Sequence, residues 1–151
     1  MTVKEKSKAG ASSTYSHWDA IDWQLVKAYV KRLQMRIAKA IREGHHHKAK
    51  SLQWLLTHSH YAKLLAARRV TQNQGKDTPG IDGDVWNTPR KKIQAVLAVK
   101  RHGYQPQPLR RIYIAKKDGN KRPLSILTMK DRLQQALYLM ALEPIVENHG
   151  R

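Results

Sequence analysis

Basic side chains are concentrated around a turn signal at residues 109–126, which read LRRIYIAKKDGNKRPLSI. Asp118 is the only acidic residue there, and the run Asp118, Gly119, Asn120 is typical of a tight β-turn. A hairpin that is merely solvated would usually mix acids among its bases. Cations grouped beside a turn instead predict a compact site for phosphate oxygens. The cations of this segment are Arg110, Arg111, Lys116, Lys117, Lys121 and Arg122.

The residues on either side of the turn alternate or are β-branched, which predicts a β-hairpin. Successive side chains of a strand point to opposite faces. Arg111 and Tyr113 are therefore expected on one face, and Arg110, Ile112 and Ile114 on the other. Cations occupy both faces of the predicted hairpin.

The other chemically versatile residues favour structural roles. Adjacent His45, His46 and His47 cannot all converge on one ion, and no acidic or cysteine partner stands at ligand spacing, so we expect no metal site. His58 and His60 would point in different directions on one helix, which favours packing and solvent contact. Four aromatic residues lie on or beside apolar stripes and are expected in the core rather than as base-stacking platforms: Trp18, Trp23, Trp54 and Tyr104.

The carboxylates are scattered, whereas two-metal phosphoryl transfer needs carboxylates that hold two cations within about 4 Å of each other. Five of them stand beside turn residues or cations: Asp77, Asp82, Asp84, Asp118 and Asp131. Asp131 is expected in the first turn of a helix, where the positive end of the helix dipole stabilises it. We predict no catalytic residue among them.

Charge and composition narrow the function further. The chain has 151 residues, and 29 Lys and Arg against 11 Asp and Glu give a net charge of +18, which predicts binding to a phosphate polyanion. No apolar run approaches the ~20 residues of a membrane span, and the N-terminus lacks a signal-peptide core. We expect a cytoplasmic protein that does not enter a membrane. Without cysteines, disulfides and thiolate metal sites are excluded.

The hydrophobic pattern predicts an α+β, mostly helical fold. Residues 1–16 have nothing to bury and are expected to be a disordered leader. From Trp18, apolar residues recur at helical spacing as far as Gly44, and a second helical pattern after the histidines includes Ser59 and extends to Val70. The short link between them predicts an antiparallel helical hairpin.

The second half alternates loops and short elements. A long loop rich in Gly and Pro follows at 72–83. A helix is then expected from Pro89 to Arg101, with Thr88 as N-cap and Gly103 as its stop. After the β-hairpin, a last helix is expected to bury one face, and Pro144 to kink or end it. That face comprises Leu133, Ala136, Leu137, Met140 and Ala141.

Two stretches of the chain resemble a known family. These are SLQWLLTHSHYAKLLAARRVTQNQGKDTPGIDG and YQPQPLRRIYIAKKDGNKRPLSILTMKDRLQQALYLMALEPIVE. They closely resemble the N-terminal part of group II intron-encoded reverse transcriptases, also called maturases. The resemblance rests on the order of a helical hairpin, a T-P-G-x-D-G loop, an R-R-x-Y-I-x-K-K hairpin and a K-D-R-x-x-Q-A-L helix. The resemblance spans roughly residues 18–147.

The resemblance implies a domain plan and an activity. Residues 17–102 would be an N-terminal helical reverse transcriptase domain whose loop 72–83 is a lid against the template strand. Residues 103–151 would begin the fingers, truncated before the palm that carries the catalytic aspartates. The intact family is an RNA-directed DNA polymerase that uses Mg²⁺, whereas for this fragment we expect no cofactor and no polymerisation alone.

The same resemblance implies site residues. Lys116 and Arg122 match the hairpin positions that contact the triphosphate of the incoming nucleotide. The basic helices match the region that holds intron or template RNA. Together with the charge pattern, this predicts RNA contacts at Lys27, Lys31, Arg32, Arg36, Lys39, Arg68, Arg69, Lys76, Arg110, Arg111, Lys117 and Lys121.

Departures from the family leave alternatives open. Ala115, Ser125 and Leu127 replace residues that are usually Pro, Gly and Pro, which loosens the bends of the hairpin. One hypothesis is an RNA-binding module that is catalytically silent alone. A second is one part of a split polymerase completed by a separate palm-bearing polypeptide, and a third is a basic RNA-binding scaffold. An exposed apolar patch on the last helix would favour the second, and a fully polar exterior the third.

Overall fold

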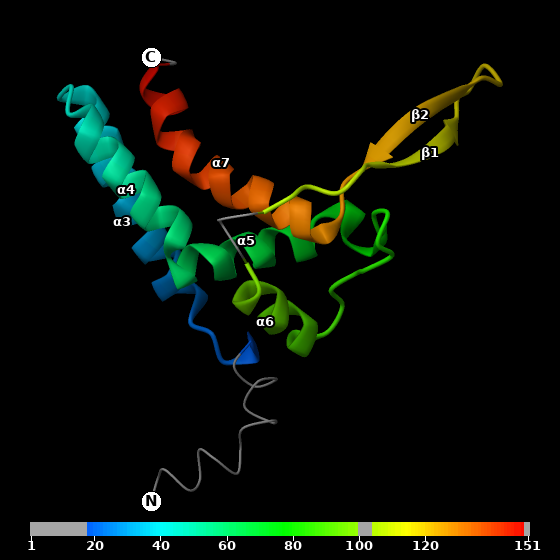
Figure 1. The fold of residues 1–151 in the computed structure, drawn as a ribbon, viewed down its shortest axis with the longest axis horizontal. Helices are drawn as coiled ribbons and strands as arrows, with labels where there is room; N and C mark the ends of the chain where they lie inside the picture. The colour runs from blue at the N-terminus through cyan, green and yellow to red at the C-terminus, as the bar shows by residue number, and fades with distance from the viewer. Residues whose placement is uncertain (1–17, 100–103, 150–151) are drawn as a thin grey trace, which may run out of the picture.

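The computed structural model describes residues 18–99 and 104–149, with side-chain burial described as far as Ile145. The expected leader at residues 1–16 lies outside the described residues. The element order is α3, α4, α5, a 3₁₀ turn η1, α6, β1, β2 and α7, so the predicted α+β, mostly helical fold is confirmed (Figure 1). Among the described residues, no helix is long and apolar enough to cross a membrane.

The first long helix, α3, spans Trp23–Arg42 and follows Asp22, whose Oδ1 accepts hydrogen bonds from the backbone N–H groups of Gln24 and Leu25 at 3.1 and 3.2 Å. This capping satisfies two of the N–H groups that a helix start leaves unpaired. The predicted end near Gly44 is confirmed, because Gly44 has φ +74°, a conformation that favours glycine.

The second helix expected from the sequence pattern is two helices in the structure. Helix α4 spans His46–His58 and α5 spans His60–Gln72, and Ser59 between them is extended, with φ −68° and ψ 132°. The Ser59 hydroxyl accepts a hydrogen bond from the N–H of Ala62 at 3.4 Å and caps α5. The expectation of one continuous helix is therefore wrong, because a serine that fits an apolar stripe is also a good N-cap. Helix α4 runs beside α3, as predicted, and α5 turns away (Figure 1).

The loop and α6 follow. The 3₁₀ turn η1 spans Gln74–Asp77, and α6 spans Pro89–Leu97. The predicted cap is confirmed, because the Thr88 hydroxyl accepts from the N–H of Lys91 at 3.2 Å. The helix ends at Leu97, short of the expected end at Arg101. The expected stop at Gly103 lies outside the described residues.

Strands β1 (Arg110–Ala115) and β2 (Lys121–Ile126) form the predicted antiparallel hairpin. Arg110 pairs with Ile126 at its base and Ala115 with Lys121 near its tip. The turn uses Gly119 with φ +87°, and Asp118 accepts from the N–H of Asn120 at 3.0 Å. Ile126 is the only buried residue of the two strands, and the hairpin extends away from the helices (Figure 1).

Helix α7 (Met129–His149) completes the core by packing against α3, α4 and α5. Its predicted apolar face is confirmed: Leu133, Leu137, Met140 and Ala141 are buried and Ala136 is partly buried. Facing residues from the other helices complete this core, among them Val26, Val30, Leu33, Ile37, Leu52, Leu56, Leu65 and Ala66.

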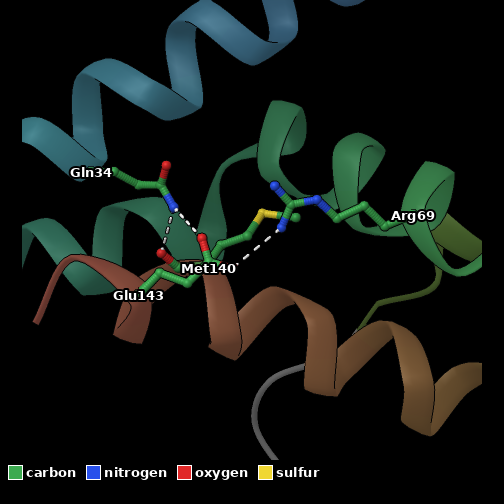
Figure 2. Close-up of polar contacts among 4 residues, drawn as sticks. All are labelled: Gln34, Arg69, Met140 and Glu143. Atoms are coloured by element: carbon green, nitrogen blue, oxygen red, sulfur yellow. Dashed lines mark hydrogen bonds and ion pairs between the residues drawn. The ribbon is translucent and has the colours of Figure 1, made fainter. Parts of the chain in front are cut away.

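Pro144 does not end α7, contrary to one of the two outcomes expected of it. Proline has no N–H, so the carbonyl of Met140 loses its helical partner. The side chain of Gln34 on α3 supplies a replacement, because its Nε2 donates to this carbonyl at 2.9 Å (Figure 2). The same Nε2 lies 3.2 Å from Glu143 Oε2, and Gln53 donates to the next carbonyl, Ala141, at 3.0 Å.

We predict that Gln34→Ala lowers the free energy of unfolding by about 1–3 kcal/mol, because it leaves a partly buried carbonyl unpaired. In a Pro144→Ala background the cost should be smaller, since the backbone N–H restored by that substitution can donate to the carbonyl of Met140. Urea denaturation of the four chains forms a double-mutant cycle, and Gln24→Ala, at an exposed site on the same helix, is the control. Equal costs of Gln34→Ala in both backgrounds would contradict this explanation.

Candidate nucleic-acid interface

The outer face of α3 carries five of the predicted RNA-binding cations. Arg32, Arg36 and Lys39 follow one another at spacings of four and three residues and form one row, and Lys27 and Lys31 form a neighbouring row. All five are exposed, and the apolar residues of α3 face the core instead. Lys39 lies 4.0 Å from Glu43, a solvent-exposed pair that binds weakly. We call these five residues the helix surface.

Arg68 and Arg69 of α5 are placed differently from this surface. The guanidinium of Arg68 lies over the ring of Trp23, 4.6 Å from its centroid, and its Nη1 is buried with no hydrogen-bond partner among the described residues. Arg69 Nη1 lies 3.7 Å from Glu143 Oε1 (Figure 2). Both guanidinium groups are thus held by protein groups, and binding a phosphate would require them to give up these contacts.

Four further cations surround the tip of the β-hairpin: Lys116, Lys117, Lys121 and Arg122. All four are exposed, and none forms an ion pair with a carboxylate of the described residues. Backbone hydrogen bonds from Lys116 N to Asn120 O (2.6 Å) and from Gly119 N to Lys116 O (3.1 Å) fix the turn. We call these four residues the hairpin tip.

The two arginines of β1 lie on opposite faces of the strand, as predicted, and they differ in exposure. Arg111 is exposed beside the equally exposed Tyr113. Arg110 is half-buried, and its Nη1 donates to the carbonyl of Pro79 at 3.0 Å. The structure therefore places Arg110, a predicted RNA contact, as a brace between the hairpin and the loop at residues 72–83.

Arg132 of α7 holds the same loop more firmly. Its Nη1 donates to Gly75 O at 2.8 Å, its Nη2 to Thr78 O at 2.5 Å and its Nε to Leu127 O at 3.0 Å. Burial lowers the pKa of Arg132, and the nearby Asp82 carboxylate opposes this shift. The loop is therefore anchored by its carbonyls. Lys76, a predicted RNA contact, is exposed within η1.

The loop at residues 72–83 requires a glycine at position 80, because it passes close to the backbone of Thr128. A Cβ placed there would lie 2.6 Å from both the Cα and the N of Thr128, which are backbone atoms that cannot easily move aside. The N–H of Gly83, which has φ +75°, donates to Gly80 O at 3.1 Å and closes the following turn. The T-P-G-x-D-G sequence thus permits the loop to contact the start of α7 directly.

Asp131 secures the chain that leads into the hairpin. Its carboxylate accepts hydrogen bonds from the hydroxyl of Tyr104 and, at 3.0 Å, from the N–H of Gln107, and its own N–H donates to Thr128 Oγ1. Burial raises the pKa of the Tyr104 phenol, and the hydrogen bond to Asp131 raises it further. The predicted place of Asp131 in the first helical turn is confirmed.

A comparison with known proteins identifies the family of this chain. The pattern that defines the N-terminal domain of reverse transcriptase matches residues 18–99, which run from Trp18 through α6. The chain belongs to this family. The resemblance inferred from the sequence is therefore confirmed.

Several relatives match part of the chain. Group II intron-encoded protein LtrA of Lactococcus lactis is 40% identical over 86 residues, which cover 55% of this chain and 14% of LtrA. Protein YkfC of Escherichia coli is 41% identical over 92 residues (55% and 23%), and maturase-like protein 1 of Euglena gracilis is 34% identical over 99 residues (64% and 22%). The matched region is less than a quarter of the length of each relative.

Within this reverse transcriptase N-terminal domain and its neighbouring hairpin, the aromatic residues are only partly as predicted. Trp18 is buried, and Trp23 and Tyr104 are partly buried. Trp54 is 56% exposed, so its expected place in the core is wrong; it lies between the buried Leu52 and Leu56 in sequence, about 200° around the helix from each. Its ring stacks on the ring of His58, with 3.6 Å between the two ring centroids.

Sequence reasoning missed the residues that fix the loop. Arg132 and the close contact at Gly80 join segments that lie far apart in the chain, and nothing in their local spacing indicated this. The only available signal was that both lie within the motifs T-P-G-x-D-G and K-D-R-x-x-Q-A-L. Among the described residues, no group of three or more His, Cys, Asp or Glu side chains could hold a metal ion.

We predict that Gly80→Ala lowers the free energy of unfolding by about 1–3 kcal/mol, because the added methyl group overlaps the backbone of Thr128. Gly75→Ala in the same loop is the control, since a Cβ there meets only Arg132 Nη1 at an ordinary contact of 3.9 Å. Urea denaturation measures both. If the two alanine variants were equally stable, the proposed tight contact between loop and helix would not exist in solution.

Proposed function

We propose that this chain is the RNA-binding N-terminal and finger segment of a group II intron-type reverse transcriptase, and that it binds intron or template RNA. The observation that carries this proposal is the position of its exposed cations. The helix surface lies on α3 and the hairpin tip lies at the far end of the molecule (Figure 1). A small anion could meet only one of them, whereas a folded RNA can span both.

The proposed mechanism is neutralisation of phosphates. Cations on a helix face and at a hairpin tip contact the RNA backbone and read its shape, with little base specificity. The anchoring of the loop and hairpin by Arg132, Arg110 and Asp131 supports this mechanism, because it fixes the direction of the hairpin relative to α7. Less conformational freedom is then lost on binding.

Lys116 and Arg122 are proposed to contact the triphosphate of the incoming nucleotide in an intact polymerase. Both are exposed on the hairpin tip, and Arg122 is paired across the strands with Ile114. Polymerisation itself is proposed to require a palm and Mg²⁺. In support, the carboxylates Asp118 and Asp131 are engaged by the hairpin turn and by Tyr104 and Gln107, which leaves them in structural roles.

We predict that the affinity of the chain for a structured intron-like RNA falls steeply between ~50 and ~200 mM salt. Replacing two helix-surface cations, Arg32→Gln with Arg36→Gln, should reduce the slope of log affinity against log salt by about 1.4–1.8, at roughly 0.7–0.9 per phosphate contact. The matched control is Lys48→Gln with Lys50→Gln, two exposed cations of α4 outside the helix surface. A flat salt response, or an equal change in the control, would refute the assignment.

A second candidate function, one part of a split reverse transcriptase, is favoured by an apolar strip. Tyr138, Leu139 and Leu142 of α7 are 47%, 53% and 50% exposed, and Trp54 of α4 is exposed nearby. Tyr138, Leu142 and Trp54 line one shallow groove together with Gln53, Thr57 and Ala141. Such a strip is a typical protein-binding surface, and it is not the fully polar exterior expected of a simple scaffold. We propose that a palm-bearing polypeptide would cover it.

The split arrangement predicts complementation. Mixed with a separately expressed palm-bearing part of a group II intron-encoded reverse transcriptase, the chain should support primer extension. Leu139→Ser with Leu142→Ser should abolish extension, and Leu97→Ser, at a site 71% exposed on α6, should not. Absence of extension with the parent chain, or full extension with the double variant, would eliminate this second candidate.

A further inference from the structure

A groove separate from both cationic surfaces opens beside the first turns of α7. It encloses about 750 Å³. Helix α6 contributes Lys91 and Gln94 to its lining, the residue after this helix is Ala98, and the start of α7 contributes Lys130. Residues 83–86 and residues 104–107 form its other sides.

Contacts with the start of α7 hold two segments beside this groove. Asp131 accepts hydrogen bonds from Tyr104 and from the N–H of Gln107, so the segment 104–107 is fastened to α7. Gly80 packs directly on the backbone of Thr128, which holds the neighbouring loop. A groove of this volume has the dimensions of a small-ligand site.

The chemistry of the walls combines three features. The apolar side is provided by Val85, by the half-buried ring of Trp86 and by Leu133. The exposed side-chain amides of Gln94 and Gln107 supply hydrogen-bond donors and acceptors. Two lysines of the lining, Lys91 of α6 and Lys130 of α7, are exposed.

A ligand that satisfies all three features has a flat apolar face, polar edges and a negative charge. Asp84 is the one acid among the described residues of the lining, so the two lysines leave a positive balance that suits an anion. A nucleotide has these properties, because its base can stack on an aromatic ring, its edges accept and donate hydrogen bonds, and its phosphate is anionic.

We propose that this groove holds a single unpaired nucleotide of the bound RNA, with its base against Trp86 and its phosphate between Lys91 and Lys130. The inference rests on the proposed function, since the nucleotide comes from RNA that the helix surface and the hairpin tip retain. It adds a preference: RNA with an unpaired segment binds more tightly than a duplex of equal length, because a paired base cannot leave its stack without cost.

The test fills the groove without disturbing the core. Ala98 lines the groove and is exposed, so Ala98→Trp places a large side chain in it. The control is Leu97→Trp, which adds the same side chain at the adjacent position, 71% exposed and outside the groove lining. Fluorescence anisotropy gives the dissociation constants of the full chain for a short single-stranded RNA and for a blunt duplex of the same length.

Ala98→Trp should weaken binding of the single strand about tenfold, the order expected for the loss of one stacked base, and leave duplex binding unchanged. Leu97→Trp should change neither. Unchanged single-strand binding by Ala98→Trp, with salt-dependent duplex binding intact, would overturn the groove assignment and leave the proposed RNA binding standing. Failure of the parent chain to bind either RNA would overturn both. Displacement of the single strand by an acidic peptide from the parent but not from Ala98→Trp would assign the groove to a protein ligand instead.

Discussion

The positions of the loop at residues 72–83 and of the hairpin depend on contacts with the first turn of α7. The backbone of Thr128, just before this turn, meets Gly80 too closely for any side chain, and Arg132 binds the carbonyls of Gly75 and Thr78. Asp131 binds the segment that enters the hairpin. One helical turn thus positions the loop, one side of the groove and the base of the hairpin. Arg110 in turn joins the base of the hairpin to the loop, because it donates to the carbonyl of Pro79.

The core formed by the helices keeps a strongly charged chain folded. A net charge of +18 favours expansion by self-repulsion, and the core of α3, α4, α5 and α7 offsets it by burying Ile37, Leu56 and Leu137 completely. The cations of the helix surface and of the hairpin tip lie outside this core. The proline inside α7 would weaken the same core, but Gln34 takes up the carbonyl that Pro144 leaves unpaired (Figure 2).

Local patterns were sufficient to predict most elements of this fold. The Thr88 cap, the Asp118 turn and the buried face of α7 each depend on residues close in sequence. The break at Ser59 was missed because the same serine fits both an apolar stripe and a helix cap.

The contacts of the candidate site were harder to predict, because they join distant segments. Arg68, Arg69 and Arg110 read as surface cations in the sequence, yet they contact Trp23, Glu143 and Pro79. A cation's partner is decided by tertiary packing, which local spacing does not encode. The exposed cations of α3 were predictable for the opposite reason, since they oppose an apolar stripe on the same helix.

We propose above all that two separated cationic surfaces, the helix surface and the hairpin tip, hold a single RNA. Lysine acylation of the free and RNA-bound chain, read by mass spectrometry, tests it most directly. We expect a structured intron-like RNA to protect Lys27, Lys31 and Lys39 on the helix surface together with Lys117 and Lys121 at the hairpin tip, while Lys48 reacts as in the free chain. Protection confined to one surface, or spread evenly over all lysines including Lys48, would contradict the claim.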